Sequence, residues 1–103
     1  MKKIKCNEFK QTVLNSNVPT VVLFSTEWSG SSIIVSGALN EIKNESNIKA
    51  RFIELGHEEC RKISGQYGIT RVPSILIFKH GEVVEHLTGV PSKTTILKAL
   101  KTI

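Results

Sequence analysis

Several kinds of segment are missing from this chain of 103 residues. No apolar run approaches the roughly 20 residues that a transmembrane helix needs, so we expect no membrane span. The basic start after Met1 is not followed by the apolar stretch of about 7–15 residues that a secretory signal contains. The sequence therefore predicts a cytoplasmic protein with no membrane partner.

Aromatic residues are scarce, at 6% of the chain, and the basic residues form no dense run. The 14 Lys and Arg residues exceed the 9 Asp and Glu residues and give a net charge of +5, but they are scattered from Lys2 to Lys101. Nucleic-acid sites usually combine clustered basic residues with aromatic side chains that stack on bases. This charge pattern favours a solvated surface, and we expect no nucleic-acid partner.

Cysteine is rare, since Cys6 and Cys60 are the only two and lie far apart in the sequence. Disulfides are uncommon in the reducing cytoplasm, so the sequence favours two unpaired thiols. A pairing of Cys6 with Cys60 stays open, because it depends on whether the Cα atoms approach within about 7 Å. His57 lies near Cys60, but two candidate ligands without spaced companions are a weak metal signal. We expect no metal and no cofactor.

The length and the hydrophobic fraction of 40% suit a single core, so we expect one domain over residues 1–103. Hydrophobic periodicity predicts an alternation of strands and helices, and the His80-Gly81 pair predicts a tight antiparallel hairpin. Helical crossovers make parallel neighbours, which gives an α/β fold with a mixed five-stranded central sheet flanked by four helices. The expected strands cover residues 2–5, 20–25, 49–55, 74–79 and 82–87, and the expected helices follow Asn7, Ser31, His57 and Pro91.

Three details of the helices are also predicted. Asn7 stands where a helix N-cap would be, because Phe9, Val13 and Leu14 follow it at helical spacing. A long second helix that runs to about Glu45-Ser46 is predicted because five apolar residues recur at helical spacing: Ile33, Ile34, Ala38, Leu39 and Ile42. Gly37 inside this helix indicates a bend or a close packing contact.

The segment 21–32 predicts a strand that runs through a small-residue turn into a helix. Its turn, Trp28-Ser29-Gly30-Ser31-Ser32, resembles the thioredoxin active-site loop Trp-Cys-Gly-Pro-Cys, with serine at both cysteine positions. Other segments match the same family in order and spacing: Tyr67-Gly68-Ile69, Val72-Pro73, the hairpin from Phe78 to Val83, and Gly89. The resemblance covers nearly the whole chain and implies the thioredoxin fold.

Ser29 and Ser32 cannot perform the exchange that the resemblance implies for these positions. Dithiol exchange needs a thiolate at the start of a helix and a second thiol one turn later. A serine hydroxyl is very weakly acidic and forms no disulfide, so capping of the helix is the favoured role of these degenerate active-site positions. A serine nucleophile is disfavoured, because the three histidines fall elsewhere in the chain.

Two further positions depart from the family pattern. The resemblance implies a buried aspartate where this chain has Leu23 and a lysine near it where this chain has Glu54. A buried carboxylate without a proton-transfer role is costly, so Leu23 favours a natural loss of the cysteines over a laboratory replacement. Ser31, in place of the usual proline, favours the same reading.

The resemblance also implies a groove that binds an extended peptide of a partner protein. A cis Val72-Pro73 bond is expected there by resemblance, and it leaves the backbone of Val72 free to pair with the peptide as an added strand. Trp28 and Pro73 could also persist only because the fold needs them. The groove residues are Trp28, Gly30, Ser31, Val72, Pro73, Gly89 and Val90.

Three functional hypotheses follow from these residues. The first is a thioredoxin-like protein that lacks the active-site cysteines, is inactive as a dithiol–disulfide oxidoreductase and retains the binding groove. The second is a thioredoxin, a protein-disulfide oxidoreductase of cell redox homeostasis, in which serines replaced the natural cysteines. The third makes Cys6 and Cys60 an alternative redox pair or a regulatory thiol.

Overall fold

The computed structural model describes residues 1–103 and contains one five-stranded sheet in the order β1-β3-β2-β4-β5. β1 and β2 each pair with β3 in parallel, whereas β4 runs antiparallel to both β2 and β5. The predicted mixed sheet is confirmed. The strands are β1 (Lys2–Lys3), β2 (Thr20–Ser25), β3 (Arg51–Gly56), β4 (Ser74–Lys79) and β5 (Glu82–Thr88).

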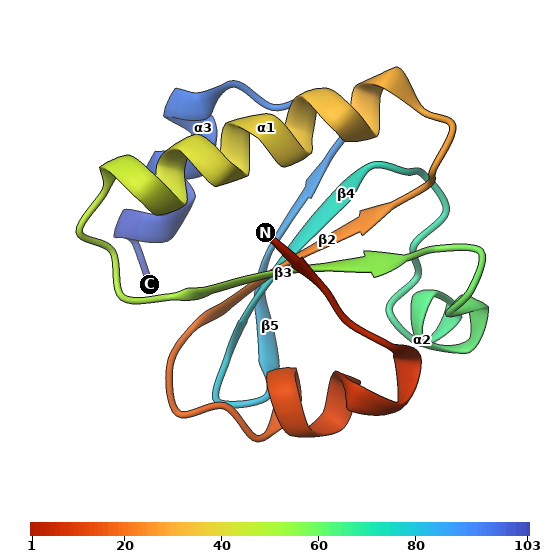
Figure 1. The fold of residues 1–103 in the computed structure, drawn as a ribbon. Helices are drawn as coiled ribbons and strands as arrows, with labels where there is room; N and C mark the ends of the chain where they lie inside the picture. The colour runs from red at the N-terminus through yellow and green to blue at the C-terminus, as the bar shows by residue number, and fades with distance from the viewer.

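Helices cover both faces of this sheet (Figure 1). α1 (Gly30–Glu45) and α3 (Lys93–Lys101) lie on one face. The helical turns η1 (Cys6–Glu8) and η2 (Lys10–Leu14) lie on the other face with α2 (Arg61–Gln66). No helix is both long enough and apolar enough to cross a bilayer.

Alternate residues of the central strand β2 supply the two halves of the core. Val21 and Leu23 pack with α1 and α3, while Val22 and Phe24 pack with the N-terminal helical turns and α2. All four side chains are fully buried, and each such burial contributes roughly 1.5–3 kcal/mol. A strand that is apolar on both faces is typical of a sheet covered on both sides.

The first helical segment begins differently from the prediction. Asn7 lies inside the 3₁₀ turn η1, and Lys5 occupies the N-cap position. The Lys5 backbone N–H donates to Glu8 Oε1 at 2.8 Å, which satisfies one of the free donors at the start of the turn. The prediction of Asn7 as the N-cap was therefore wrong, because the Glu8 carboxylate closes the turn around Lys5.

The apolar residues that predicted α1 do not all face the core. Ile33 and Ile34 are 68% and 60% exposed, whereas Val35, Leu39 and Ile42 are buried. Ser32 is buried in the first turn and sets the face that points inward. Gly37 is exposed, and a Cβ built there would meet no atom within 4 Å, so the predicted close packing at this glycine is wrong.

The hairpin between β4 and β5 turns through two residues in the left-handed region. His80 has φ 51° and Gly81 has φ 79°, which is typical of a tight type I′ turn. A side chain at Gly81 would also press on the backbone carbonyl of Leu14. The predicted antiparallel hairpin is confirmed.

Candidate redox site and binding loop

The loop between β2 and α1 is held by the serines that begin the helix. Ser29 is the N-cap of α1, and its Oγ accepts the backbone N–H of Ser32 at 3.2 Å. The Oγ of Ser32 in turn accepts the backbone N–H of Thr26 at 3.3 Å. Both hydroxyls are therefore used in local hydrogen bonds that stabilise the start of the helix.

Sheet register brings the predicted groove segments to one end of the sheet. Phe24 of β2 pairs with Ser74 of β4, and Ser74 pairs with Thr88 of β5. The loop after β2, the segment before β4 and the segment after β5 must therefore meet at this end. The Val72-Pro73 bond is cis, as the resemblance implied.

The side chains around this sheet end are largely apolar and reach solvent. Trp28 is 92% exposed, and Val90 is 51% exposed. Gly89 has φ 75°, and its N–H donates to the carbonyl of Pro73 at 3.0 Å, which joins two of the groove segments. Sequence periodicity missed the exposed Ile33 in the first turn of α1, because an apolar residue in a helix is usually assigned to the core.

Leu23 and Glu54 lie at neighbouring positions of β2 and β3. Leu23 is fully buried, so no carboxylate lies beneath the loop at this position. Glu54 is partly buried and accepts the hydroxyl of Ser25 at 2.6 Å. With Ser32 and Thr26, it lines a hollow of about 170 Å³ beside α1.

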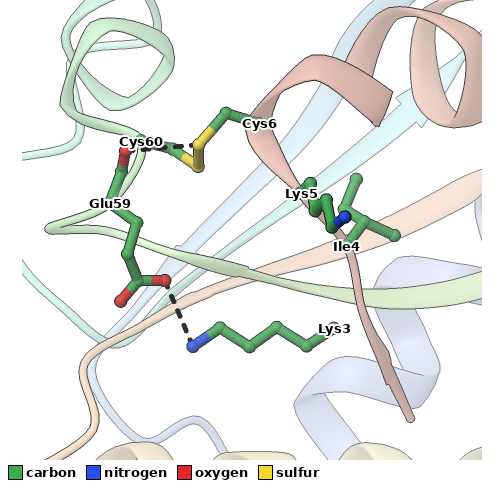
Figure 2. A pocket seen from close by; sticks show the side chains of 6 residues that line it. All are labelled: Lys3, Ile4, Lys5, Cys6, Glu59 and Cys60. Atoms are coloured by element: carbon green, nitrogen blue, oxygen red, sulfur yellow. Dashed lines mark hydrogen bonds and ion pairs between the residues drawn. A yellow bond between two sulfur atoms is a disulfide. The ribbon is translucent and has the colours of Figure 1, made fainter.

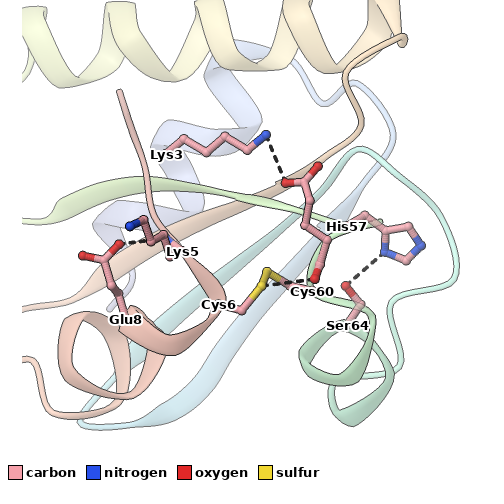
Figure 3. Close-up of a disulfide and its surroundings, with 8 residues drawn as sticks. Lys3, Lys5, Cys6, Glu8, His57, Cys60 and Ser64 are labelled. Carbon is pink, nitrogen blue, oxygen red and sulfur yellow. Dashed lines mark hydrogen bonds and ion pairs between the residues drawn. A yellow bond between two sulfur atoms is a disulfide. The ribbon is translucent and has the colours of Figure 1, made fainter.

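Cys6 and Cys60 form a disulfide, with their Cα atoms 5.5 Å apart (Figure 3). The prediction of unpaired thiols was wrong, because parallel pairing of β1 with β3 brings the ends of both strands together. Cys60 is buried, at 4% exposure, and contributes to the core, whereas Cys6 is only partly buried. The two half-cystines therefore differ in burial.

A hollow of about 350 Å³ lies beside this disulfide (Figure 2). The Nζ of Lys3 forms an ion pair with Glu59 Oε2 at 3.2 Å, and the Glu59 carbonyl oxygen lies 3.2 Å from Cys6 Sγ. A Cβ on Gly56 would collide with the Glu59 carboxylate, so glycine there leaves room for this side chain. The hollow is lined by Lys3, Ile4, Lys5, Cys6, Glu59 and Cys60.

The loop carrying Trp28 and the segment before Cys60 are joined by hydrogen bonds. The backbone N–H of His57 donates to the carbonyl of Ser25 at 2.8 Å, and the Thr26 hydroxyl donates to the Glu58 carboxylate. The His57 ring meets the Ser64 hydroxyl of α2 at 3.0 Å (Figure 3). The disulfide therefore adjoins the loop end of the sheet.

A mixed sheet with helices on both faces, in which a cis proline precedes β4 and an exposed tryptophan precedes a helix, defines the thioredoxin fold. The family model described as Thioredoxin matches residues 1–102. The chain belongs to the thioredoxin family.

Individual relatives agree with this assignment. The chain is 34% identical over 93 residues to "Thioredoxin 1" of Nostoc sp., which covers 90% of this chain and 87% of that protein. It is 33% identical to "Thioredoxin 1" of Synechococcus elongatus, over 89% of this chain and 86% of the relative. It is 32% identical to "Thioredoxin" of Rickettsia felis, over 88% of this chain and 87% of the relative.

These findings correct the first functional hypothesis. The chain was expected to lack active-site cysteines and to be redox-inactive, yet Cys6 and Cys60 form a disulfide in a member of the thioredoxin family. The thioredoxin relatives favour the second hypothesis, a protein-disulfide oxidoreductase. The sequence did not predict the bond, because disulfides are uncommon in the cytoplasm and the distance between the two Cα atoms cannot be read from the sequence.

Proposed function

We propose that this chain is a thioredoxin-class protein-disulfide oxidoreductase, which is the activity of the second hypothesis, and that its redox pair is Cys6 and Cys60, which is the pair of the third hypothesis. The observation that carries the proposal is their disulfide, in which Cys6 is a partly exposed residue and which adjoins the Trp28 loop. Ser29 and Ser32 cap the helix and supply no thiol. Exchange in this chain therefore requires the cysteine pair.

The chemistry of the pair follows from the unequal burial of its members. In the reduced protein, the thiolate of Cys6 attacks a disulfide of the partner protein, which forms a mixed disulfide and releases one partner thiolate. The thiol of Cys60 then loses its proton, and its sulfur attacks Cys6 Sγ, which forms the Cys6–Cys60 bond and releases the second partner thiolate. The partner is reduced by two electrons, and the pair is oxidised.

The partner in this proposal is a protein that offers an extended segment to the groove. The exposed ring of Trp28 supplies a large apolar contact, and the exposed Val90 supplies a second one. Val72 belongs to no strand, so its backbone pairs with the segment as an added strand. Gly30, Ser31, Pro73 and Gly89 complete the groove.

We place this activity in the cytoplasm. Disulfides of cytoplasmic proteins are usually transient and serve catalysis or redox sensing, whereas purely structural ones are rare there. A pair that opens and closes during exchange fits this setting.

The test is the reduction of insulin by a dithiol reductant, followed as turbidity of the precipitating chains. We expect this protein to accelerate the reaction above the reductant alone. The Cys6→Ser and Cys60→Ser variants should each return it to the background rate. A rate at background for the unaltered protein would overturn the proposal.

A Ser29→Cys, Ser32→Cys variant tests the cysteine positions of the family loop. Its activity in a background that also carries Cys6→Ser reports exchange at the loop alone. If the unaltered protein is active and the loop-only variant is not, the Cys6–Cys60 pair carries the chemistry. If Cys6→Ser leaves the activity of the unaltered protein unchanged, the assignment of the redox pair is wrong.

A further inference from the structure

We infer that the hollow beside the disulfide admits a low-molecular-weight anionic thiol, which reduces the pair by attacking Cys6 Sγ. This inference rests on the proposed function, because it names the electron donor of the same cysteine pair. It specifies which sulfur is attacked and the chemical class of the attacking molecule.

Burial selects Cys6 as the attacked sulfur. A thiolate must reach a sulfur atom directly to displace its partner, so the rate depends on access. Cys60 is 4% exposed and packs in the core with Ile4 and Ile69, whereas Cys6 is partly exposed at the start of η1. The displaced sulfur is therefore Cys60.

The size of the hollow favours a small molecule. Its volume of about 350 Å³ is near the lower end of the roughly 300–1,000 Å³ typical of small-molecule sites. Figure 2 shows Lys3 and Glu59 joined across one side of the hollow, with the two sulfur atoms on another side. A thiol that carries a short chain fits this space, whereas a folded protein surface must approach from outside.

Charge favours an anionic thiol over a neutral one. The lining carries two lysines against one glutamate. The Glu59 carboxylate is neutralised by Lys3 at 3.2 Å, while the Lys5 ammonium forms no ion pair. Lys5 adjoins Cys6 in the sequence and is exposed, so it is the free cation that a carboxylate on the incoming thiol would meet.

The reaction balances with two molecules of thiol. The first thiolate forms a bond to Cys6 Sγ, the Cys6–Cys60 bond breaks, and the electron pair leaves on Cys60, which takes up a proton. A second thiolate attacks the sulfur of the first molecule, releases Cys6 as a thiolate and leaves a small-molecule disulfide. The protein gains two electrons and the two thiols lose them.

The first experiment compares reduction by 3-mercaptopropionate and by 2-mercaptoethanol, with rates divided by the thiolate fraction of each reagent. The same chain unfolded in urea gives the intrinsic ratio of the two reagents. At low salt, we expect the rate ratio of the anionic to the neutral thiol to be about fivefold to tenfold higher in the folded chain than in the unfolded chain. The reason is that a cleft of one charge raises the local concentration of ligands of the opposite charge.

Charge-neutral variants identify the cation. Lys5→Gln should remove most of the preference for the anionic thiol, and so should about 0.5 M salt. The control is Lys10→Gln, which replaces an exposed lysine outside the hollow and should leave the preference unchanged. A folded-chain rate ratio equal to the ratio measured on the unfolded chain would overturn the inference. So would a preference that Lys5→Gln leaves intact.

The second experiment locates the attacked sulfur. Glutathione is added to the oxidised chain, the reaction is quenched with acid within seconds, and the mixed disulfide is mapped by mass spectrometry. We expect glutathione on Cys6 at least tenfold more often than on Cys60. A majority on Cys60 would overturn the inference, and the use of the unaltered chain avoids any variant that fails to fold.

The two proposals fail in different ways. If small thiols open the pair with the expected preference but insulin reduction stays at background, the proposed function fails and the donor assignment stands. If insulin reduction depends on Cys6 while the folded chain shows no preference for the anionic thiol beyond the ratio of the unfolded chain, the donor assignment fails and the proposed function stands.

Discussion

Cys6 is the first residue of the 3₁₀ turn η1, which follows the two-residue strand β1, and neither element is stable alone. Its bond to Cys60 fixes this segment to the end of β3 across 54 positions of sequence. Cross-links that close long loops reduce the entropy of the unfolded chain most strongly. The bond that we propose as the redox centre therefore also anchors the N-terminus.

Replacement of Cys6 by serine should lower the free energy of unfolding by about 4 kcal/mol in the chain-entropy treatment of a loop of this length. Urea unfolding without reductant measures the change. The control is the same pair of proteins in dithiothreitol, where the unaltered chain has also lost its cross-link. A difference that persists undiminished in the reductant would show that Cys6 contributes through packing instead.

Trp28→Ala should leave the free energy of unfolding within about 0.5 kcal/mol of the unaltered protein, because the side chain is 92% exposed. Its kcat/KM for insulin should fall about tenfold or more, as expected when a large aromatic contact is removed from a binding surface. Val84→Ala, which removes an exposed apolar side chain from β5, is the matched control. Equal losses in both variants would argue against the groove.

At the scale of single elements, α1 shows how a capped first turn determines the face of a helix that is buried. Ser29 caps the helix and Ser32 points inward, so Val35, Leu39 and Ile42 follow into the core. Periodicity predicted the extent of α1 well, because apolar residues recur through it. It did not show that Ile33 and Ile34 point outward, because two adjacent apolar residues define no single face.

Gly37 is a second informative position in α1. Since nothing lies within 4 Å of a Cβ built there, Gly37→Ala should raise the free energy of unfolding by about 1 kcal/mol. Gly68→Ala is the contrasting control, because Gly68 has φ 64° and alanine would be strained there. Thermal and urea unfolding measure both changes, and a destabilised Gly37→Ala variant would contradict the open environment.

At the scale of the molecule, Lys93 links the two helices that cover one face. Its Nζ contacts Glu45 Oε2 at 2.6 Å and Glu41 Oε2 at 3.3 Å. Both hydrogen bonds raise the pKa of Lys93 above its ordinary value of 10.5, and the bond to Glu45 has the larger effect. The charged form is thus favoured by folding, and the stabilisation is fully present below pH 10.5 and is lost as pH rises through the folded pKa.

The stability of the unaltered protein relative to Lys93→Gln should therefore be constant from about pH 6 to 9 and shrink above pH 10.5. Because the group is exposed, the difference should be small and should fall with added salt. Urea unfolding across this range measures it, with Lys98→Gln as a control on the same helix. If the difference in free energy of unfolding between the two proteins grows above pH 10.5, the charged form of Lys93 does not stabilise the fold through the two glutamates.

Much of the whole fold could be predicted from the sequence, because strands that are apolar on both faces, a tight turn and helical crossovers leave few arrangements. The family loop and the cis Val72-Pro73 bond were also expected by resemblance. The disulfide was not, since periodicity gives the direction of strands but not the distance between two residues beyond their ends. Nor could sequence show that Lys5 stays free of an ion pair while Lys3 is held by Glu59.

The short length of β1 has a consequence for how the protein behaves at high concentration. β1 pairs with only Ile53 and Glu54 of β3. This edge of the sheet is therefore covered by little more than the N-terminal segment that the disulfide anchors. Uncovered strand edges pair with other molecules and promote aggregation. Reduced samples should therefore become turbid sooner than oxidised ones on storage, and light scattering would show whether the redox state also controls colloidal stability.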